Sequence, residues 1–280
     1  MTNTPLTQDE ALAVLDWYRA AGVDTAVGDE PVDRFATSAV VATRRAPVLA
    51  AAPLPAPAPP VPLVTDPAET REIAAGAASL EQLRAAMAAY DGCGLKHRAT
   101  QLVFADGNPE AQIMLVGEGP GEQEDKQGKP FVGRAGQLLD RMLGAIGLDR
   151  TKVYIANMVP WRPPGNRNPT PDELAQCAPF LHRQVELVNP KLLVTLGNVP
   201  TQALFATAQG ITRMRGQWKT LEINNWSGPV LPTLHPAFLL RTPSAKAQAW
   251  KDMLSLKQAM TREGLGDKRD ASPGADQVQD

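Results

Sequence analysis

The stretch that decides the fold is QIMLVGEGPGEQEDKQGKPFVGR, residues 112–134. It begins with an apolar run rich in strand-forming residues, 113–116, which ends abruptly at three glycines and a proline interleaved with glutamates such as Glu118. After a charged segment the chain reaches Phe131 and enters an amphipathic helical pattern over residues 134–146. An acidic side chain and an aromatic ring are therefore carried around one strand end, which is where open α/β sheets place their ligands.

Three further apolar runs alternate with helical patterns along the chain. The runs cover residues 153–157, 191–196 and 229–234, and the helical patterns cover residues 134–146, 172–188, 198–206 and 244–262. Alternation of this kind builds a mostly parallel sheet with helices on both faces. We therefore predict an α/β fold, a three-layer α/β/α sandwich with a central, mostly parallel four-stranded sheet.

Polar or conformationally permissive residues stand at or just after the end of each of the four predicted strands. They are Glu118, Asn157, the pair Gly197-Asn198 and the pair His235-Pro236. Because the carboxyl ends of parallel strands meet at one edge of a sheet, we expect these residues to line a pocket. Taken singly, Asn157 could be a turn residue, His235 a structural histidine and Phe131 a core residue. Their joint placement favours a functional site.

The glycine-rich turn has an alternative interpretation as a phosphate or dinucleotide site. Its spacing, Gly117-x-Gly119-x-Gly121, differs from GxGxxG, and the Lys-Ser/Thr pair of a P-loop is missing. The glutamates in the turn would also repel phosphate. We therefore favour a ligand other than a nucleotide phosphate.

The domain organisation is predicted from changes in composition. Residues 46–63, APVLAAAPLPAPAPPVPL, cannot form a core and are typical of an extended linker. We predict four parts: an N-terminal helical segment over 1–36, with its helix at 7–21; an Ala/Pro-rich disordered linker over 37–77; a compact domain over 78–262, entered through a helix at 80–89; and a disordered tail over 263–280.

Composition and charge limit the class of protein. With 43% hydrophobic residues, the 280-residue chain can bury one core. It has no apolar run near the roughly 20 residues of a membrane helix and no signal-peptide pattern at its start, and its two cysteines fit a reducing compartment. We expect a cytoplasmic monomer without membrane contact. Residues 1–92 hold 6 Lys/Arg against 12 Asp/Glu, whereas residues 93–266 hold 20 against 14, which is compatible with a polyanionic partner of the basic part.

Four motifs carry a resemblance to a known family. They are GEGPGEQED (117–125), PFVGRAGQLLDRML (130–143), N-x-V-x-x-R-P-P-G-N-R-N-P-T-P (157–171) and LHPAFLLR (234–241). In this order they resemble the type-4 uracil-DNA glycosylase family. The resemblance implies a monofunctional hydrolase that cleaves the N-glycosidic bond of uracil in single- or double-stranded DNA. It would release uracil and leave an abasic site, the first step of base-excision repair.

The resemblance also implies roles for the pocket residues. Phe131 would stack on the flipped uracil, Asn157 would pair with its Watson–Crick edge, and backbone groups around Gly119 would contact the base. Glu118 would orient or activate water and stabilise the cationic sugar, and His235 would stabilise negative charge on a uracil oxygen.

The surrounding residues receive roles in the same way. Glu122 and Asp125 would support the loop. The segment from Pro236 to Arg241 is expected to be a loop with an apolar tip that wedges into the duplex. Its predicted DNA contacts are Pro236, Phe238, Leu239 and Arg241, and the predicted phosphate contacts are Arg162, Arg167, Arg213, Arg215 and Lys246. Contacts of the second kind would make DNA binding salt-dependent.

One departure from the family concerns its metal site. The resemblance implies a 4Fe–4S cluster held by four cysteines, but the matching positions read Tyr90, Cys93, Trp161 and Cys177. Two thiolates would hold a cubane poorly. We therefore expect no metal and no other cofactor, with the two aromatic side chains filling the volume of the cluster.

Alternative functions stay open at this point. A related group captures uracil covalently through a histidine-containing insertion after its second strand, but here the loop reads PPGNRNPTPDE (163–173) and has no histidine, which favours hydrolysis. The chain could instead be a weakly active or inactive DNA-binding, partner-recruiting homologue, or a nucleotide-metabolising α/β enzyme. The N-terminal segment could recruit a repair or replication protein, and preference for uracil over hypoxanthine is undecided.

Overall fold

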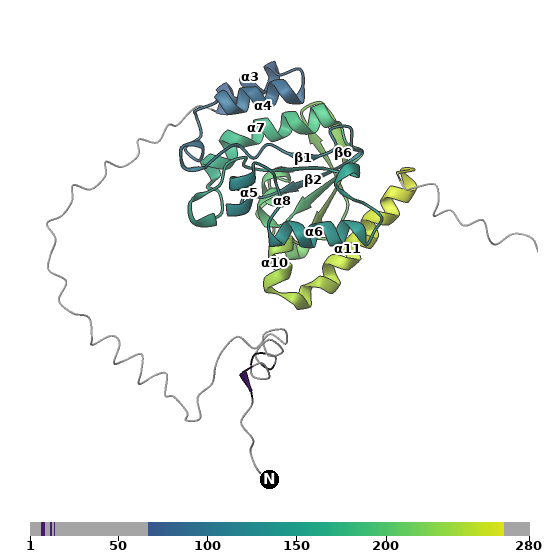
Figure 1. Ribbon diagram of the computed structural model, residues 1–280. Coiled ribbons are helices and arrows are strands. Elements are labelled where there is room, and N and C mark those ends of the chain that lie inside the picture. The colour runs from purple at the N-terminus through teal and green to yellow at the C-terminus, as the bar shows by residue number, and fades with distance from the viewer. Residues whose placement is uncertain (1–6, 9–11, 13, 15–66, 266–280) are drawn as a thin grey trace, which may run out of the picture. The chain divides into compact units, whose positions relative to one another are not determined.

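The computed structural model of the protein describes residues 7, 8, 12, 14 and 67–265, and the last of these ranges holds the sheet and its helices (Figure 1). Apart from four positions, the helix predicted over 7–21 and the linker predicted up to residue 66 lie outside the described residues. The tail from residue 266 onward lies outside them as well. Within the described part, no helix has the length and apolar character needed to cross a membrane.

The centre of the domain is a six-stranded mixed sheet with the order β1-β3-β2-β4-β6-β5. Its strands are β1 (Asp106–Gly107), β2 (Ile113–Gly117), β3 (Tyr154–Asn157), β4 (Leu192–Leu196), β5 (Lys219–Ile223) and β6 (Trp226–Thr233). The four predicted strands form the parallel centre, β3-β2-β4-β6, as expected. The prediction of four strands was incomplete, because β1 pairs antiparallel with β3 and β5 pairs antiparallel with β6 at the two edges.

Helices cover both faces of this sheet. They are α3 (Pro67–Gly76), α4 (Leu80–Ala89), α5 (Glu122–Gln127), α6 (Arg134–Gly144), α7 (Pro171–Val188), α8 (Asn198–Leu204), α9 (Ile211–Met214), α10 (Pro236–Arg241) and α11 (Lys246–Arg262). Figure 1 shows α3, α4 and α7 on one side of the sheet and α6, α10 and α11 on the other. The three-layer α/β/α prediction is confirmed.

The central strand β2 explains why the layers form. All five of its residues are buried. Ile113 and Leu115 pack in a cluster with residues of α6 and α11, whereas Met114 and Val116 pack with residues of α7. Because successive side chains of a strand point to opposite faces, an uninterrupted apolar run is what a strand covered on both sides requires.

The compact domain begins earlier than predicted. Residues 67–76, assigned from the sequence to the linker, form α3, which packs against α7 and buries Thr70 and Ala74. Helix α4 has the predicted bounds and is capped by Ser79, whose side chain accepts a hydrogen bond from Gln82 N. The predicted linker therefore extends too far, because the helix begins at Pro67. Proline is tolerated there, since it is the first residue of the helix.

Helix α7 fixes the end of the long loop after β3. Thr170 and Glu173 form a reciprocal capping box, in which each side chain accepts a hydrogen bond from the other's backbone N–H. Pro171 follows as the first helical residue. The loop between β3 and α7, which contains Arg162-Pro163-Pro164, is thus anchored at both ends, by β3 and by this cap.

Candidate active site

The carboxyl ends of the parallel strands open into a cleft of about 580 Å³. All of the predicted strand-end residues except Pro236 lie together in its wall, with the predicted uracil-pocket residues Gly119 and Phe131: Glu118, Asn157, Gly197, Asn198 and His235. Arg167, Phe238 and Arg241 line the same cleft. Residues from distant parts of the chain are therefore brought to one concave surface by the topology of the sheet.

The turn after β2 is held against the segment after β3. Gly117 O accepts a hydrogen bond from Met158 N at 2.9 Å, and Glu118 O accepts one from Val159 N at 3.1 Å. A Cβ on Gly119 would lie 2.7 Å from Val159 Cγ2, so a side chain here would push the turn away. Burial raises the pKa of Glu118, and nearby Arg241 opposes that rise. A carboxylate whose pKa is raised is a stronger base than an ordinary glutamate and is suited to accept a proton from water.

Asn157 presents an amide to the cleft. The residue is 7% exposed, and its Oδ1 atom is buried without a hydrogen-bond partner. A Cβ on Gly117 would lie 2.4 Å from Oδ1 and 2.6 Å from the Phe131 ring. The glycine therefore allows the amide and the ring to approach each other. A buried acceptor left unpaired in this way is costly unless a ligand supplies the donor.

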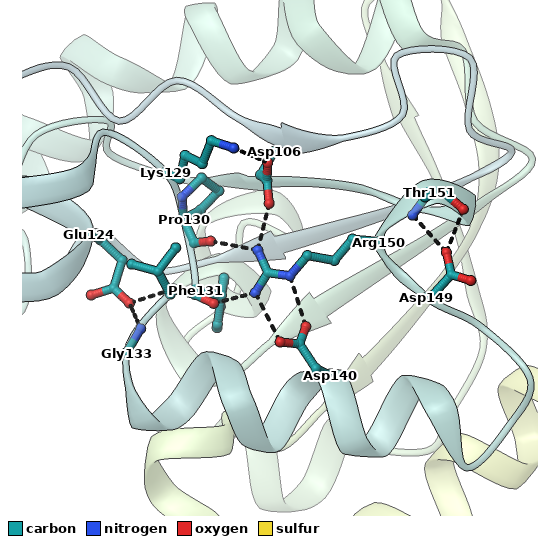
Figure 2. Close-up of polar contacts among 11 residues, drawn as sticks. Asp106, Glu124, Lys129, Pro130, Phe131, Gly133, Asp140, Asp149, Arg150 and Thr151 are labelled. Atoms are coloured by element: carbon teal, nitrogen blue, oxygen red, sulfur yellow. Dashed lines mark hydrogen bonds and ion pairs between the residues drawn. The ribbon is translucent and has the colours of Figure 1, made fainter.

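Phe131 forms the other wall beside this amide. Its ring centroid lies 5.5 Å from that of His235, and its backbone has φ 54°, in the left-handed region that aromatic residues rarely adopt. Two side chains, Glu124 and Arg150, hold this backbone (Figure 2). Neither was predicted from the sequence to have this role. Glu124 Oε1 accepts hydrogen bonds from Val132 N and Gly133 N, at 2.9 and 2.8 Å, while Arg150 donates to the carbonyls of Pro130 and Phe131.

His235 is held in one neutral tautomer. Its Nδ1 atom accepts a hydrogen bond from Ala237 N at 3.1 Å, so the proton of the neutral ring is on Nε2. Burial, with a smaller contribution from Arg241, lowers the pKa of His235 to about 4. At pH 7 the imidazole is neutral and retains one N–H donor, on Nε2. A Cβ on Gly197, at φ 97°, would lie 2.9 Å from His235 Cβ, so this glycine makes room for the histidine.

The two predicted loop-support residues differ in their surroundings. Asp125 is buried and accepts hydrogen bonds from Thr100 N and Thr100 Oγ1, both at 2.8 Å, which ties α5 to the segment before β1. Glu122 forms an exposed ion pair with Lys126 at 2.5 Å. Of the two carboxylates, Asp125 is thus the one that links separate parts of the chain.

The segment from Pro236 to Arg241 is a helix, α10, and not the loop expected from the sequence. His235 caps it and Pro236 is its first residue. Pro236 and Leu239 are buried, and Leu239 packs with Leu234 in a cluster beneath the helix. Both side chains are buried in this conformation, and their contacts with DNA stay predictions. Phe238 and Arg241 line the cleft, and Leu240, 37% exposed, is the outward-facing apolar residue.

The predicted phosphate contacts fall into two groups. Arg213 and Lys246 are exposed. The other three are engaged within the protein: Arg162 Nε donates to Asn166 Oδ1 at 2.8 Å, Arg167 forms two hydrogen bonds with Glu173, and Arg215 is paired with buried Asp252. Arg215 also donates to the carbonyl of Gln248. Its guanidinium thus joins the segment after α9 to α11. Arg215 would have to give up these bonds to contact a phosphate.

The four positions that match the cluster ligands of the family meet in one buried group. Tyr90, Cys93, Trp161 and Cys177 are all 5% exposed or less, and they pack together with Phe180. Cys93 Sγ and Cys177 Sγ are 3.7 Å apart, and Tyr90 Oη lies 2.9 Å from Thr70 Oγ1. Across residues 67–265 no group of three or more His, Cys, Asp or Glu side chains could hold a metal. This packing does not fit a four-thiolate iron–sulfur cluster.

Comparison with known proteins agrees with the geometry of the cleft. The model of the uracil DNA glycosylase superfamily matches residues 104–254. The chain is 40% identical over 185 residues to the type-4 uracil-DNA glycosylase of Sulfurisphaera tokodaii, covering 64% of this chain and 84% of the relative. It is 42% identical over 178 residues to that of Thermotoga maritima, covering 61% and 90%.

A type-5 uracil-DNA glycosylase, from Thermus thermophilus, matches less of the chain. It is 34% identical over 115 residues, covering 36% of this chain and 52% of the relative. The resemblance found in the motifs thus extends over most of the described domain, and it is stronger to the type-4 relatives than to this one. The chain belongs to the type-4 uracil-DNA glycosylase family of the uracil DNA glycosylase superfamily.

Proposed function

We propose that this protein excises uracil from DNA by hydrolysing its N-glycosidic bond, and that the four cleft residues Glu118, Phe131, Asn157 and His235 carry out the reaction. The observation that carries the proposal is the unpaired Oδ1 of Asn157 beside the ring of Phe131. An amide next to an aromatic wall offers a donor and an acceptor to the edge of a planar base while the base face stacks on the ring.

In this mechanism the base leaves the duplex and enters the cleft. The amide of Asn157 accepts from the N3–H of uracil through Oδ1 and donates to the adjacent carbonyl through its NH₂ group. Thymine has the same edge, but its 5-methyl group needs additional space beside the base. In this orientation of the amide, cytosine is mismatched, because it presents an acceptor at N3 and a donor where uracil has a carbonyl.

Bond cleavage separates charge across the same cleft. As the C1′–N1 bond breaks, the electron pair moves onto uracil and a positive charge develops on the sugar. The Nε2–H of neutral His235 donates to a uracil carbonyl oxygen, where negative charge grows. Glu118 stabilises the cationic sugar and orients a water molecule, whose oxygen adds to C1′ while its proton passes to the carboxylate. Glu118 then releases the proton to solvent and the uracil anion takes one up, so the products are free uracil and an abasic site.

Release of uracil from single-stranded, U·G and U·A oligonucleotides tests this proposal. Wild-type protein is expected to release free uracil catalytically from them without an SDS-stable adduct and without cutting the backbone. Glu118→Ala is expected to lose this activity while binding DNA normally. A wild-type protein that binds DNA but releases no uracil would instead support the inactive, partner-recruiting alternative. Hydrolysis of free nucleotides would support the alternative of a nucleotide-metabolising enzyme.

We further propose that the protein works without an iron–sulfur cluster. The aromatic side chains of Tyr90 and Trp161 lie at the positions of two ligands, and the remaining thiols are in contact with each other. Protein purified anaerobically is expected to show no broad absorption near 400 nm and substoichiometric iron, with full uracil release. Stoichiometric iron together with that absorption band would contradict the proposal.

DNA is the substrate in this proposal, and the basic residues around the cleft, such as Arg241, support electrostatic binding of its backbone.

We also propose that the protein is a cytoplasmic monomer and that its N-terminal segment recruits a repair or replication protein. A pull-down with the full chain, compared with one lacking residues 1–60, tests the recruitment.

A further inference from the structure

The backbone at Phe131 is in a conformation that needs external support. Its φ of 54° lies in the left-handed region, where a bulky side chain is unfavourable. The carbonyl oxygen of Phe131 also packs closely against Gly136 of α6, since a Cβ on this glycine would lie 1.6 Å from that oxygen. A ring that must meet a flipped base is thus attached to a strained segment, and the contacts that hold this segment decide where the ring lies.

Arg150 makes the contacts that fit this need. Its Nη1 donates to Pro130 O at 3.2 Å and its Nη2 donates to Phe131 O, so one guanidinium holds the carbonyls on both sides of the Phe131 Cα (Figure 2). Two carboxylates orient the guanidinium in turn. Asp106 Oδ2 accepts from Nη1 at 2.6 Å, and Asp140 Oδ1 on α6 accepts from Nε at 2.8 Å. The arginine side chain is 25% exposed.

The position of Arg150 in the chain connects this support to the rest of the cleft. It begins the short 3-10 turn Arg150–Lys152, which ends two residues before the start of β3, and β3 ends at Asn157. The residue that fixes the backbone of the ring and the residue that carries the amide are therefore parts of one segment. A shift of the Phe131 backbone would change the spacing between the ring and this amide.

We propose that Arg150 is a positioning residue for uracil excision, which fixes the ring of Phe131 relative to the amide of Asn157. The inference rests on the proposed function of this cleft and extends it to a side chain outside the cleft. Lysine cannot replace the arginine, because one ammonium group lacks the planar fork that reaches two carbonyls and two carboxylates together. Misplacing a substrate-positioning group by about 1 Å can lower a rate about 100-fold.

The test is a comparison of Arg150→Lys with Arg183→Lys. Arg183 is a matched control, since its side chain is 22% exposed and it binds the carbonyl of Ala77 and the carboxylate of Glu186, away from the cleft. Single-turnover uracil release at saturating enzyme is expected to fall about 10- to 100-fold in R150K and to stay near the wild-type rate in R183K. Affinity for uracil-free duplex is expected to be unchanged in both.

A double-mutant cycle with Phe131→Ala separates positioning from a general effect on the fold. If Arg150 acts through the ring, R150K is expected to change the rate of the F131A protein little, because the group it positions is gone. Asp140→Asn, which weakens the orientation of the guanidinium, is expected to lower the rate in the same direction as R150K. It also provides the test should R150K fail to fold.

Three results would overturn the positioning role. The first is a wild-type rate of uracil release in both R150K and D140N, or in D140N alone if R150K does not fold. The second is a lower melting temperature of R150K with an unchanged rate. The third is a double variant in which the rate losses of R150K and F131A multiply. A wild-type protein that releases no uracil would contradict the proposed function itself. These failures are thus distinguishable in one set of measurements.

Discussion

Asn157→Asp is expected to lower kcat/KM for uracil release by at least about 10³-fold, since a site that hydrogen-bonds its substrate rejects a mispaired edge by about 10⁴–10⁵-fold. In the wild type the amide can donate to one group of the base edge and accept from the next. An aspartate at this 7%-exposed position accepts only, so its second oxygen faces a uracil carbonyl without a proton between them. Two buried acceptors in contact are left unpaired and repel each other.

The matched control for this change is Asn108→Asp. Asn108 Oδ1 accepts a hydrogen bond from Glu110 N at 2.9 Å in an exposed turn before β2, and an aspartate can do the same there. It adds the same charge to the protein without entering the cleft. The measurement is kcat/KM on a uracil-containing oligonucleotide for both variants, together with their melting temperatures. An N157D protein that keeps its activity within tenfold of the wild type would show that Asn157 does not read the base.

Most of the fold could be predicted because a buried parallel strand appears in the sequence as a continuous apolar run. Ile113 to Val116 and the runs at 191–196 and 229–234 are apolar on both faces, and each is followed by a polar or glycine residue. The edge strands show no such run. β1 has two residues, and β5 is mostly exposed, so packing against β6 determines it more than its own composition does.

The site shows the same division between local and distant causes. Glu118, Asn157 and His235 could be predicted because each lies at the end of a strand or within two residues of it, and the motifs indicated that Phe131 lies beside them. The burial of Leu239 could not be predicted, because it depends on whether residues 236–241 form a loop or a helix, and a helix turns one face inward. Arg150 was missed because it is 19 residues from Phe131, and its partners meet only in the folded chain.

The second large effect is expected for His235→Asn, which should lower the single-turnover rate of uracil release about 10²- to 10³-fold, the loss typical of one such donor. Binding of uracil-free and abasic DNA should change little. The reason is that the Nε2–H of His235 meets a uracil oxygen whose negative charge appears only as the bond breaks, so the interaction strengthens in the transition state. His182→Asn is the matched control, because burial also lowers the pKa of His182 and its side chain lines a different groove, beside α3 and α7.

The pH dependence of the wild type distinguishes a neutral from a cationic donor. The pKa of His235 is lowered to about 4, so the ring stays neutral as the pH falls through 6.5, the usual pKa of a histidine. Glu118, whose pKa is raised above its usual 4.5 by burial, becomes protonated first. The rate is therefore expected not to rise as the pH falls through 6.5, and to decrease as the carboxylate of Glu118 is protonated, and Glu118→Gln should remove that decrease from the residual activity. A rate that rises as the pH drops through 6.5 would instead mean that imidazolium is the active form, and the hydrogen bond from Ala237 N to Nδ1 would then have to break before the reaction.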